Sequence, residues 1–386
     1  MTAGPRALVF AYACNPEKGS EPGAGAMLVT VVAGFSAQVT VITRREPGLD
    51  AGALALRLGE NVRLIQTGSG SSAWPTYLRY LAWVLSAAAV ARKLRTQLTF
   101  DVVHHATYAS DWFVNPMVFM RKTLGERWVW GPAGGASYAP ISVGRAVTQS
   151  PATSELLRKL VTAPMRTFVH TVMRNRVDVA LALNGDSERR FRKSGMGEVS
   201  VQSNAVFDYA EFPARILPAT PLVVYAGRGE SWKGLPLVIS AMRHLPPAWR
   251  LSIAGPGTDT VKFRRMAAPF GDRVDFLGAL DRTTTLGLFA RATAVALPSL
   301  HDSAPWAAGE AAGIGVPVVC LTLGGVAAMA GPLAIAVSPQ PIRTLSERYG
   351  KALLGAAKVR LAPSRLHTEA ALENAMKSAY GVEERL

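Results

Sequence analysis

Two carboxylates in the second half of the chain stand at a spacing that suits ligand binding. Asp302 and Glu310 lie eight residues apart in LPSLHDSAPWAAGEAAGIGVPVVC, which indicates a strand, a polar loop, a helix and a second strand. Asp302 would fall in the loop and Glu310 in the helix, with Pro317 ending that helix. Carboxylate oxygens accept hydrogen bonds from hydroxyl groups, so the pair can hold two parts of one ligand. The alternative is an ordinary β-α-β unit with two solvated acids.

A glycine-containing loop with two cations follows an apolar run near the middle of the chain. Residues 222–226 precede GRGESWKGL, in which the cations are Arg228 and Lys233. Glycines such as Gly227 let the backbone approach a ligand, while a guanidinium fork and an ammonium group bind phosphate oxygens. The pattern therefore predicts a diphosphate site. The alternative is a solvated loop with two surface cations.

Short apolar runs mark the strands that must position these residues. In the first half they fall at 7–12, 38–43, 62–66, 102–105, 128–130 and 179–183. In the second half they fall at 222–226, 250–254, 274–276, 294–297 and 318–321. Continuous apolar runs separated by helical stretches indicate parallel strands buried on both faces. Each half is therefore predicted to form a doubly wound α/β domain.

The same patterns predict where the domains begin and end. We expect a first domain over residues 1–206, a proline-containing linker over 207–221, a second domain over 222–350 and a helical segment over 351–386. A chain of 386 residues suits two domains of ordinary size. Facing doubly wound domains would place a ligand cleft at the carboxyl ends of both sheets.

Several motifs, taken in order, resemble those of retaining GT-B glycosyltransferases, and of glycosyltransferase family 4 (glycosyl transferases group 1) in particular. In the second half, the carboxylate pair is similar to E-x7-E with Asp in the first position, and GRGESWKG is similar to G-R-x-x-x-x-K-G. IAGPG is similar to the family's I-x-G-x-G turn. In the first half the matching segments are NPEKGSEPGAG, HHATY and WGPAGG. These motifs cover most of the chain.

The resemblance implies an α/β protein of the GT-B fold, with two Rossmann-like doubly wound domains facing a central cleft. The first domain would bind the acceptor and the second the nucleotide sugar, and the terminal helical segment would cross back to the first domain. The implied reaction moves a sugar from a nucleoside-diphosphate sugar to an acceptor hydroxyl with retention of configuration. It would be a hexosyltransferase-type reaction.

The resemblance also implies roles for single residues. Those near the transferred sugar and its diphosphate would be His105, Arg228, Lys233 and Asp302. Those that bind the rest of the donor would be Gly227, Gly255, Gly257, Ser303 and Glu310. Those in an acceptor or phosphate loop would be Gly23, Gly25, His104, Gly134 and Gly135. The glycines and histidines fit structural turns and satisfied core positions as well.

The implied partners are a nucleotide-sugar donor and a small-molecule or lipid-linked acceptor. No metal-binding spacing stands in a suitable place, so we expect cations to replace a divalent ion and no cofactor beyond the donor. The net charge of +15 favours anionic partners. Nucleic acid is not among them, because the chain lacks finger spacings and interleaved aromatic and basic residues.

The sequence predicts a cytoplasmic protein, because no hydrophobic signal core opens the chain. Peripheral contact with a membrane is a further expectation. Two stretches, 77–95 and 156–176, combine apolar residues with basic flanks. The alternative for both is a packed helix with a solvated basic edge.

Three other functions remain open at this point. A GT-B sugar-nucleotide epimerase would act on the donor without an acceptor. A catalytically weak GT-B partner protein would bind nucleotide and transfer nothing. A Rossmann oxidoreductase is disfavoured, because neither half contains G-x-G-x-x-G at its first strand.

Overall fold

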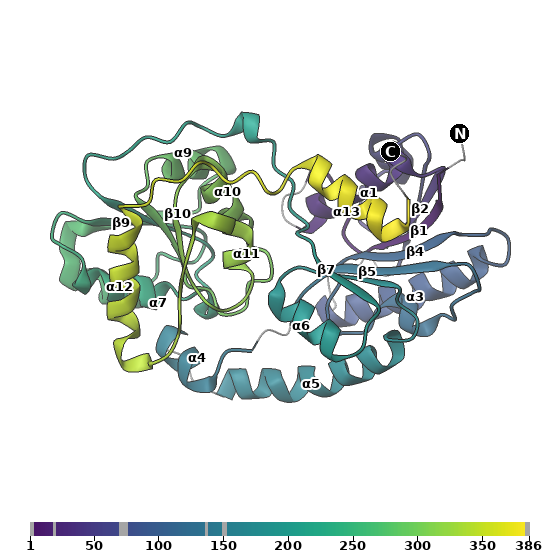
Figure 1. The fold of residues 1–386 in the computed structure, drawn as a ribbon, viewed down its shortest axis with the longest axis horizontal. Helices are drawn as coiled ribbons and strands as arrows, with labels where there is room; N and C mark the ends of the chain where they lie inside the picture. Colours follow the sequence, from purple (N-terminus) through teal and green to yellow (C-terminus); the bar gives the residue numbers. More distant parts are fainter. Residues whose placement is uncertain (1–3, 18–20, 69–75, 136–137, 149–152, 383–386) are drawn as a thin grey trace. The chain divides into compact units, whose positions relative to one another are not determined.

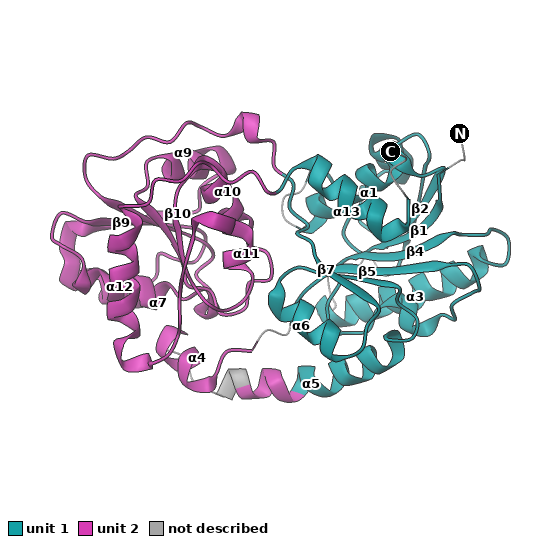
Figure 2. Cartoon of the chain, viewed as in Figure 1, with its two compact units in different colours: residues 1–136, 161–206, 367–386 teal, residues 137–160, 207–366 magenta. Residues whose placement is uncertain are grey.

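The computed structural model describes residues 4–17, 21–68, 76–135, 138–148 and 153–382. Within them the chain forms two compact units (Figure 2). Unit 1 comprises Met1–Ala136, Val161–Val206 and His367–Leu386, and unit 2 comprises Ser137–Leu160 and Phe207–Leu366. This division differs from the predicted boundaries, because residues 137–160 belong to the second unit and 367–386 to the first. The predicted linker, 207–221, is part of unit 2.

Unit 1 is built on a parallel sheet of seven strands in the order β3-β2-β1-β4-β5-β6-β7 (Figure 1). The strands are β1 (Arg6–Ala11), β2 (Gln38–Arg44), β3 (Val62–Thr67), β4 (Val102–Thr107), β5 (Arg127–Ala133), β6 (Val179–Ala182) and β7 (Glu198–Val201). The helices are α1 (Glu21–Phe35), α2 (Ala51–Leu58), α3 (Thr76–Leu94), α5 (Thr153–Met173, shared with unit 2), α6 (Gly185–Lys193) and α13 (Glu369–Tyr380), with the 3-10 helix η1 (Pro116–Phe119).

Apolar alternation along the strands builds a core on each face of this sheet. In β1, Leu8 and Phe10 pack into one core, which α3 and α6 cover. Ala7 and Val9 point to the opposite core, where α1 and α13 lie. Because successive strand residues face opposite sides, a fully apolar strand must be covered on both. The terminal helix α13 supplies part of that cover for unit 1.

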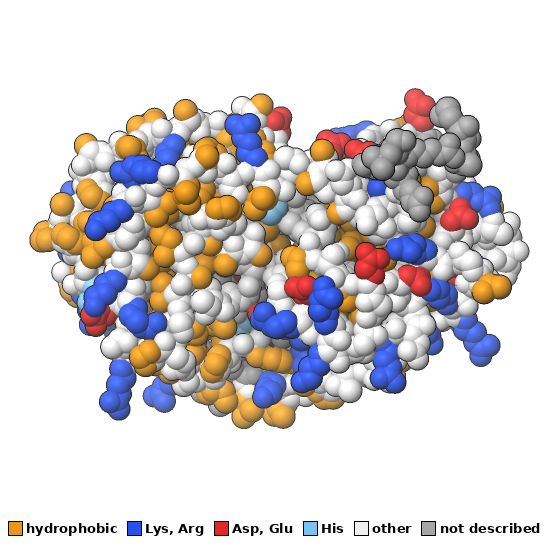
Figure 3. Space-filling view, in the orientation of Figure 1, with side chains coloured by type: hydrophobic (Ala, Val, Ile, Leu, Met, Phe, Trp, Pro, Cys, Tyr) orange, Lys and Arg blue, Asp and Glu red, His pale blue; other side chains and the backbone are white. Residues whose placement is uncertain are grey.

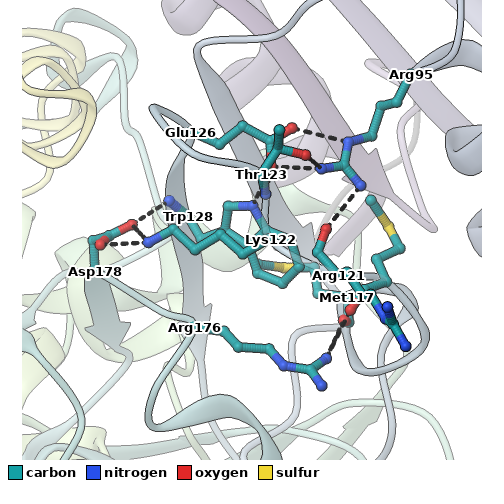
Figure 4. Close-up of polar contacts among 10 residues, drawn as sticks. Arg95, Met117, Arg121, Lys122, Thr123, Glu126, Trp128, Arg176 and Asp178 are labelled. Atoms are coloured by element: carbon teal, nitrogen blue, oxygen red, sulfur yellow. Dashed lines mark hydrogen bonds and ion pairs between the residues drawn. The ribbon is translucent and has the colours of Figure 1, made fainter.

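A polar network closes the amino-terminal ends of β5 and β6 (Figure 4). The Arg95 guanidinium donates to both carboxylate oxygens of Glu126, with Nε–Oε1 at 2.9 Å and a second contact at 2.6 Å. Lys122 Nζ lies 2.6 Å from both carboxylate oxygens of Asp178, and one of these also accepts from the Trp128 amide. These charges tie loops to the sheet at the edge opposite the strands' carboxyl ends.

Unit 2 contains a parallel sheet of six strands in the order β10-β9-β8-β11-β12-β13. The strands are β8 (Leu222–Ala226), β9 (Arg250–Ala254), β10 (Val274–Gly278), β11 (Ala294–Leu297), β12 (Val318–Leu321) and β13 (Ala334–Val337). The α-helices are α4 (Ile141–Thr148), α7 (Leu235–Ala241), α8 (Val261–Ala267), α9 (Arg282–Ala290), α10 (Trp306–Ile314), α11 (Val326–Ala330) and α12 (Leu345–Ala356). The 3-10 helices are η2 (Tyr209–Glu211), η3 (Ser231–Lys233), η4 (Met242–His244), η5 (Ala268–Arg273), η6 (Gly331–Leu333) and η7 (Ile342–Thr344).

Both sheets follow the Rossmann strand order, in which the chain reverses direction across the sheet after its third strand. This reversal separates β1 from β4 in unit 1 and β8 from β11 in unit 2. Loops after the two strands at such a point diverge and leave room for a ligand at their carboxyl ends. The strand order therefore predicts a ligand site at the loops that follow β8 and β11.

Candidate donor-binding site

The loops after β8 and β11 meet in an ion pair. Lys233, the last residue of η3, places its Nζ 2.8 Å from both carboxylate oxygens of Asp302. The Leu300 amide also donates to the Trp232 carbonyl at 2.9 Å, so the two loops are joined along the backbone. Two predicted site residues, far apart in sequence, are thereby brought together at the switch point of the sheet, which is the place between β8 and β11 where the strand order reverses.

The pair is largely removed from solvent. The side chains of Lys233 and Asp302 are 18% and 14% exposed. The ammonium group also lies 4.5 Å from the ring centroid of Trp232, a distance that suits a cation–π contact. A cation held this way has a fixed position with little side-chain freedom left. Such a group can bind an anion without reorganising.

Glycines allow the loops after β8 and β9 to lie against each other. A Cβ atom on Gly255 would lie 2.0 Å from the Gly227 carbonyl oxygen, and one on Gly229 would lie 1.8 Å from that of Gly257. The Gly227 amide donates to the Ala254 carbonyl at 3.0 Å. Gly255 and Gly257 have φ angles of +131° and +72°, which residues with side chains rarely adopt. The two predicted glycine motifs therefore form one tight backbone layer.

The loop after β12 completes this edge of the sheet. The Gly325 amide donates to the Asp302 carbonyl at 2.7 Å, and Gly324 has a φ of +66°. A Cβ on Gly324 would lie 2.6 Å from that same carbonyl oxygen. This glycine pair fixes the backbone of Asp302, which in turn fixes the direction of its carboxylate.

Arg228 does not join the ion pair. Its side chain is 63% exposed and lies 3.3 Å from the Glu230 carboxylate. The Tyr225 hydroxyl donates to the Arg228 carbonyl at 3.1 Å, so the backbone of this residue is fixed while its guanidinium extends toward solvent. An exposed cation with an exposed partner gains little from that partner and can change partners at small cost.

Glu310 lies in α10, as the spacing predicts, and has a partner that the sequence analysis missed. Its Oε1 accepts from Arg282 Nε at 2.8 Å, and Arg282 also contacts Glu211 at 3.0 Å. The Glu310 side chain is 10% exposed. Arg282 follows the N-cap residue Asp281, which is a recognisable helix start. Nothing in the spacing of 28 residues signals that the two side chains meet.

The start and end of α10 refine two expectations. Ser303 lies in the loop between Asp302 and the helix, and the helix begins at Trp306. The helix ends at Ile314 because Gly315 adopts a left-handed φ of +90°, so it terminates before the predicted stop at Pro317. Gly313 permits close packing, since its Cβ would lie 2.7 Å from the ring of Tyr209 and 2.6 Å from that of Phe212. The predicted linker is therefore packed on this helix.

In unit 1, the two adjacent histidines of β4 are both fully buried. His104 Nδ1 lies 2.9 Å from the Tyr380 hydroxyl of α13, and its Nε2 lies 2.5 Å from the Gly131 carbonyl. His105 points to the other face, 6.4 Å from the Trp83 ring by centroids. Burial lowers the pKa of His104 to about 4 and that of His105 to about 3. Both are therefore neutral at pH 7.

This burial places both imidazoles inside unit 1, and their expected contact with a sugar or acceptor stays a prediction. Strand alternation sends them to opposite faces, and helices cover both. Within the described part of the chain, neither ring nitrogen of His105 has a hydrogen-bond partner. His104 anchors the terminal helix through Tyr380, which is a structural function.

The predicted glycine loop after β1 is largely helical where it is described. Residues 18–20 lie outside the described residues, and α1 begins at Glu21, so Gly23 and Gly25 are helical. A Cβ on Gly25 would lie 2.1 Å from the Ala13 carbonyl oxygen, so this glycine lets α1 approach the strands. Glu21 Oε1 accepts from the Tyr108 amide at 2.7 Å and links α1 to the end of β4. Burial raises the pKa of Glu21, against the lowering effect of its hydrogen bonds with Tyr108 and Asn204.

Gly134 and Gly135 lie at the carboxyl end of β5. The Gly134 amide donates to the Ala109 carbonyl at 2.9 Å, which joins the loop after β4 to this strand. Gly135 has a φ of +106°, and its carbonyl accepts from Arg190 at 2.9 Å. Both are turn glycines on the edge where unit 1 would receive a ligand. The Gly134 amide is therefore used within the turn.

The described residues contain no cluster of three or more His, Cys, Asp or Glu side chains arranged to hold a metal ion. In the same residues, no helix combines the length and apolar character needed to cross a membrane.

Residues 210–360 match the family of glycosyl transferases group 1. The glycogen synthase of Mycobacterium tuberculosis (strain ATCC 25618 / H37Rv) is 32% identical over 168 residues, which is 39% of this chain and 39% of the relative's length. The chain thus matches about two fifths of that curated relative.

Two solved structures show the fold. Sucrose-phosphate synthase from Thermosynechococcus elongatus superposes with a TM-score of 0.65 at 18% identity, covering 98% of both chains. HepE from Anabaena, solved in complex with UDP, superposes with a TM-score of 0.59 at 15% identity, covering 98% of this chain and 100% of its own. The chain therefore has the GT-B fold of two Rossmann-like domains, and its residues 210–360 match the glycosyl transferases group 1 family.

Proposed function

We propose that the protein transfers a sugar from a nucleoside-diphosphate sugar to an acceptor hydroxyl, with retention of configuration and without a metal ion. The observation that carries this proposal is the Lys233–Asp302 pair at the switch point of the second sheet. The family match over residues 210–360 covers this pair, and the similar fold of HepE was solved with UDP bound.

The chemistry follows from charge. When the sugar leaves, negative charge builds on the diphosphate, and a fixed cation stabilises that charge more strongly than it stabilises the bound donor. Lys233 is such a cation, because Asp302 and the Trp232 ring fix its ammonium group. Arg228 supplies the second cation once a diphosphate competes with Glu230 for its guanidinium.

The remainder of the donor would lie along α10. The amino-terminal end of this helix carries partial positive charge, and no side chain caps it at Pro305. Ser303 precedes it and offers a hydroxyl to a phosphate oxygen. Glu310 accepts hydrogen bonds from ribose hydroxyls, with Arg282 fixing its carboxylate. The glycine layer of Gly227, Gly255 and Gly257 would lie beside the base.

The acceptor is a hydroxyl group on a small molecule or a lipid-linked saccharide, bound by unit 1. The carboxyl edge of its sheet carries Gly134, Gly135 and the Glu21–Tyr108 link. Metal independence rests on the two cations, which would neutralise the leaving group in place of a divalent ion. We therefore expect EDTA to leave turnover unchanged, and a strict Mn²⁺ or Mg²⁺ requirement would contradict the proposal.

A donor screen tests the proposal. The purified protein is incubated with UDP-, GDP-, ADP- and TDP-sugars while thermal stability and sugar release are followed, the latter by mass spectrometry. We expect one sugar nucleotide to raise the melting temperature and to release free sugar slowly, with its anomeric configuration retained when read at once by NMR.

Other products would separate the alternatives. An isomerised sugar nucleotide would identify an epimerase and overturn the transfer mechanism. Stabilisation with no released or transferred sugar, with every candidate acceptor, would identify a binding protein instead.

A further inference from the structure

Helix α5 carries a continuous stripe of exposed apolar side chains. Leu157, Leu160, Val161 and Phe168 are 63%, 63%, 55% and 52% exposed, and the exposed Pro164 lies between them. These positions follow the i, i+3, i+4, i+7, i+11 spacing of one helical face. The opposite face contributes Val169 and Met173 to the core of unit 1. A soluble helix normally presents polar residues where this one presents leucine and phenylalanine.

The segment that carries this stripe is basic. The segment 156–176 contains five basic residues and no acidic one. Figure 3, in which α5 runs along the lower edge as in Figure 1, shows hydrophobic side chains there with Lys and Arg side chains among them. Arg176 donates to carbonyls of η1, and the exposed cations of this segment are Lys159 and Arg174. An exposed apolar stripe on a basic segment is complementary to a surface with a negative headgroup layer and an apolar interior.

A groove opens at the amino-terminal part of the same helix, within unit 2. It has a volume of about 1140 Å³, and its apolar lining includes Pro140, Ile141, Leu156 and Ile342. Arg145 and Lys159 also line it. Leu156 and Lys159 belong to α5, so the helix forms one wall of the groove. Apolar walls with two cations suit an acyl chain attached to a phosphate headgroup.

The other basic helix predicted to contact a membrane, α3, is built differently. Its apolar residues Tyr80, Trp83 and Val84 are buried in the core of unit 1, and only scattered ones such as Leu78 and Leu85 are exposed. The apolar centre that α3 shows in the sequence is therefore core. In α5 one whole stripe of apolar residues is turned outward, although Val169 and Met173 are core.

We propose that the exposed face of α5, with the groove at its amino-terminal part, docks the protein on an anionic lipid bilayer. The apolar stripe enters the boundary between headgroups and acyl chains, and the exposed Lys159 and Arg174 contact the lipid phosphates. Docking here would serve a lipid-linked acceptor, but the surface itself requires neither donor nor turnover. Failure of sugar transfer and failure of docking are therefore separate results.

Vesicle co-sedimentation tests this surface on the full chain. Vesicles of phosphatidylcholine with phosphatidylglycerol are compared with vesicles of phosphatidylcholine alone. We expect binding to the anionic vesicles that weakens as NaCl is raised, because headgroup attraction is screened by salt. The triple variant Leu157→Gln/Leu160→Gln/Phe168→Gln should lose binding by ~10-fold or more, since three apolar anchors are removed.

The matched control is Leu78→Gln/Leu85→Gln in α3, which changes leucines of similar exposure and should bind as the unchanged chain does. Circular dichroism and thermal unfolding establish that each variant is folded. Absence of vesicle binding by the unchanged chain, or equal binding by the triple variant, would overturn the proposal. A dimer that the triple variant converts to monomer, with no vesicle binding, would assign the stripe to a second copy instead.

Discussion

Replacing Lys233 by methionine should separate a structural salt bridge from a catalytic cation. At 2.8 Å and an effective dielectric constant of about 20, the attraction between Lys233 and Asp302 is about 6 kcal/mol. Desolvation of two mostly buried groups offsets a large part of it. The cost of breaking the pair then falls between ~1 kcal/mol for exposed pairs and ~3–5 kcal/mol for buried ones. We expect Lys233→Met to lower the free energy of unfolding by about 2–3 kcal/mol.

The same variant should lower donor turnover by roughly 10²–10³-fold, the effect of removing one fixed electrostatic contact with a developing charge. The double variant Lys233→Met/Asp302→Asn removes both charges and leaves no buried carboxylate without its partner. We expect it to recover most of the lost stability, measured by urea unfolding, because an uncharged pair of similar volume is tolerated. It should recover none of the turnover.

Recovery of turnover in the double variant would contradict a catalytic role for Lys233, because it would show that this lysine acts only by compensating the charge of Asp302. Lys262→Ala is the control, since Lys262 is an exposed lysine of α8 in the same unit and should change neither measurement.

Three further predictions concern packing, pH and the ribose carboxylate. Gly255→Ala should lower the free energy of unfolding by about 3 kcal/mol or more, because the new Cβ would lie 2.0 Å from a backbone carbonyl oxygen. The control is Gly287→Ala in α9, where the new Cβ meets open space and should stabilise the fold by up to ~1 kcal/mol. Equal effects of the two substitutions would contradict the packing argument. Burial holds the pKa of His105 at about 3 in the folded chain, whereas an unfolded chain protonates this imidazole below about pH 6.5. Because only the unfolded chain binds the proton between these values, the free energy of unfolding falls by roughly 1.4 kcal/mol for each pH unit below about 6.5. In urea unfolding at pH 7 and pH 5, His105→Leu should reduce the loss by about 2 kcal/mol, and an unchanged loss would contradict the burial argument. Arg282→Ala should raise the KM for the donor by roughly 10-fold with a smaller change in kcat, because it frees the Glu310 carboxylate to rotate; an unchanged KM would remove this pair from the site.

The sequence predicts the central strands of both sheets well because they are continuous apolar runs. It misses β7 (Glu198–Val201) and β13 (Ala334–Val337), which lie at sheet edges and are only partly buried. An edge strand has one neighbour and more solvent contact, so its residues carry little apolar pattern. The beginning of α1 is missed for another reason. Pro22, Gly23 and Gly25 suggest a loop, yet close packing on the strands requires glycine inside the helix.

In the candidate site, too, some features could be predicted from the sequence and others could not. Local motifs place Lys233 and Asp302 in loops after strands, and the Rossmann strand order then makes their meeting predictable. The Arg282–Glu310 contact joins two helices through side chains, and no local pattern encodes it. The burial of the β4 histidines is not evident from the sequence, because a strand's carboxyl end and its buried middle have similar residue patterns. Only the helices packed on either face show that His104 and His105 are covered.

Titration with nucleoside diphosphates tests whether the Lys233–Asp302 pair lies in a donor site. UDP, GDP, ADP and TDP are titrated into the unchanged chain, Lys233→Met and Lys262→Ala, with affinity measured by calorimetry in the presence of EDTA. We predict that one nucleotide binds the unchanged chain and Lys262→Ala equally, and binds Lys233→Met at least ~10-fold more weakly. Binding that is equal in all three proteins, or no binding of any nucleotide, would contradict a donor site at the Lys233–Asp302 pair.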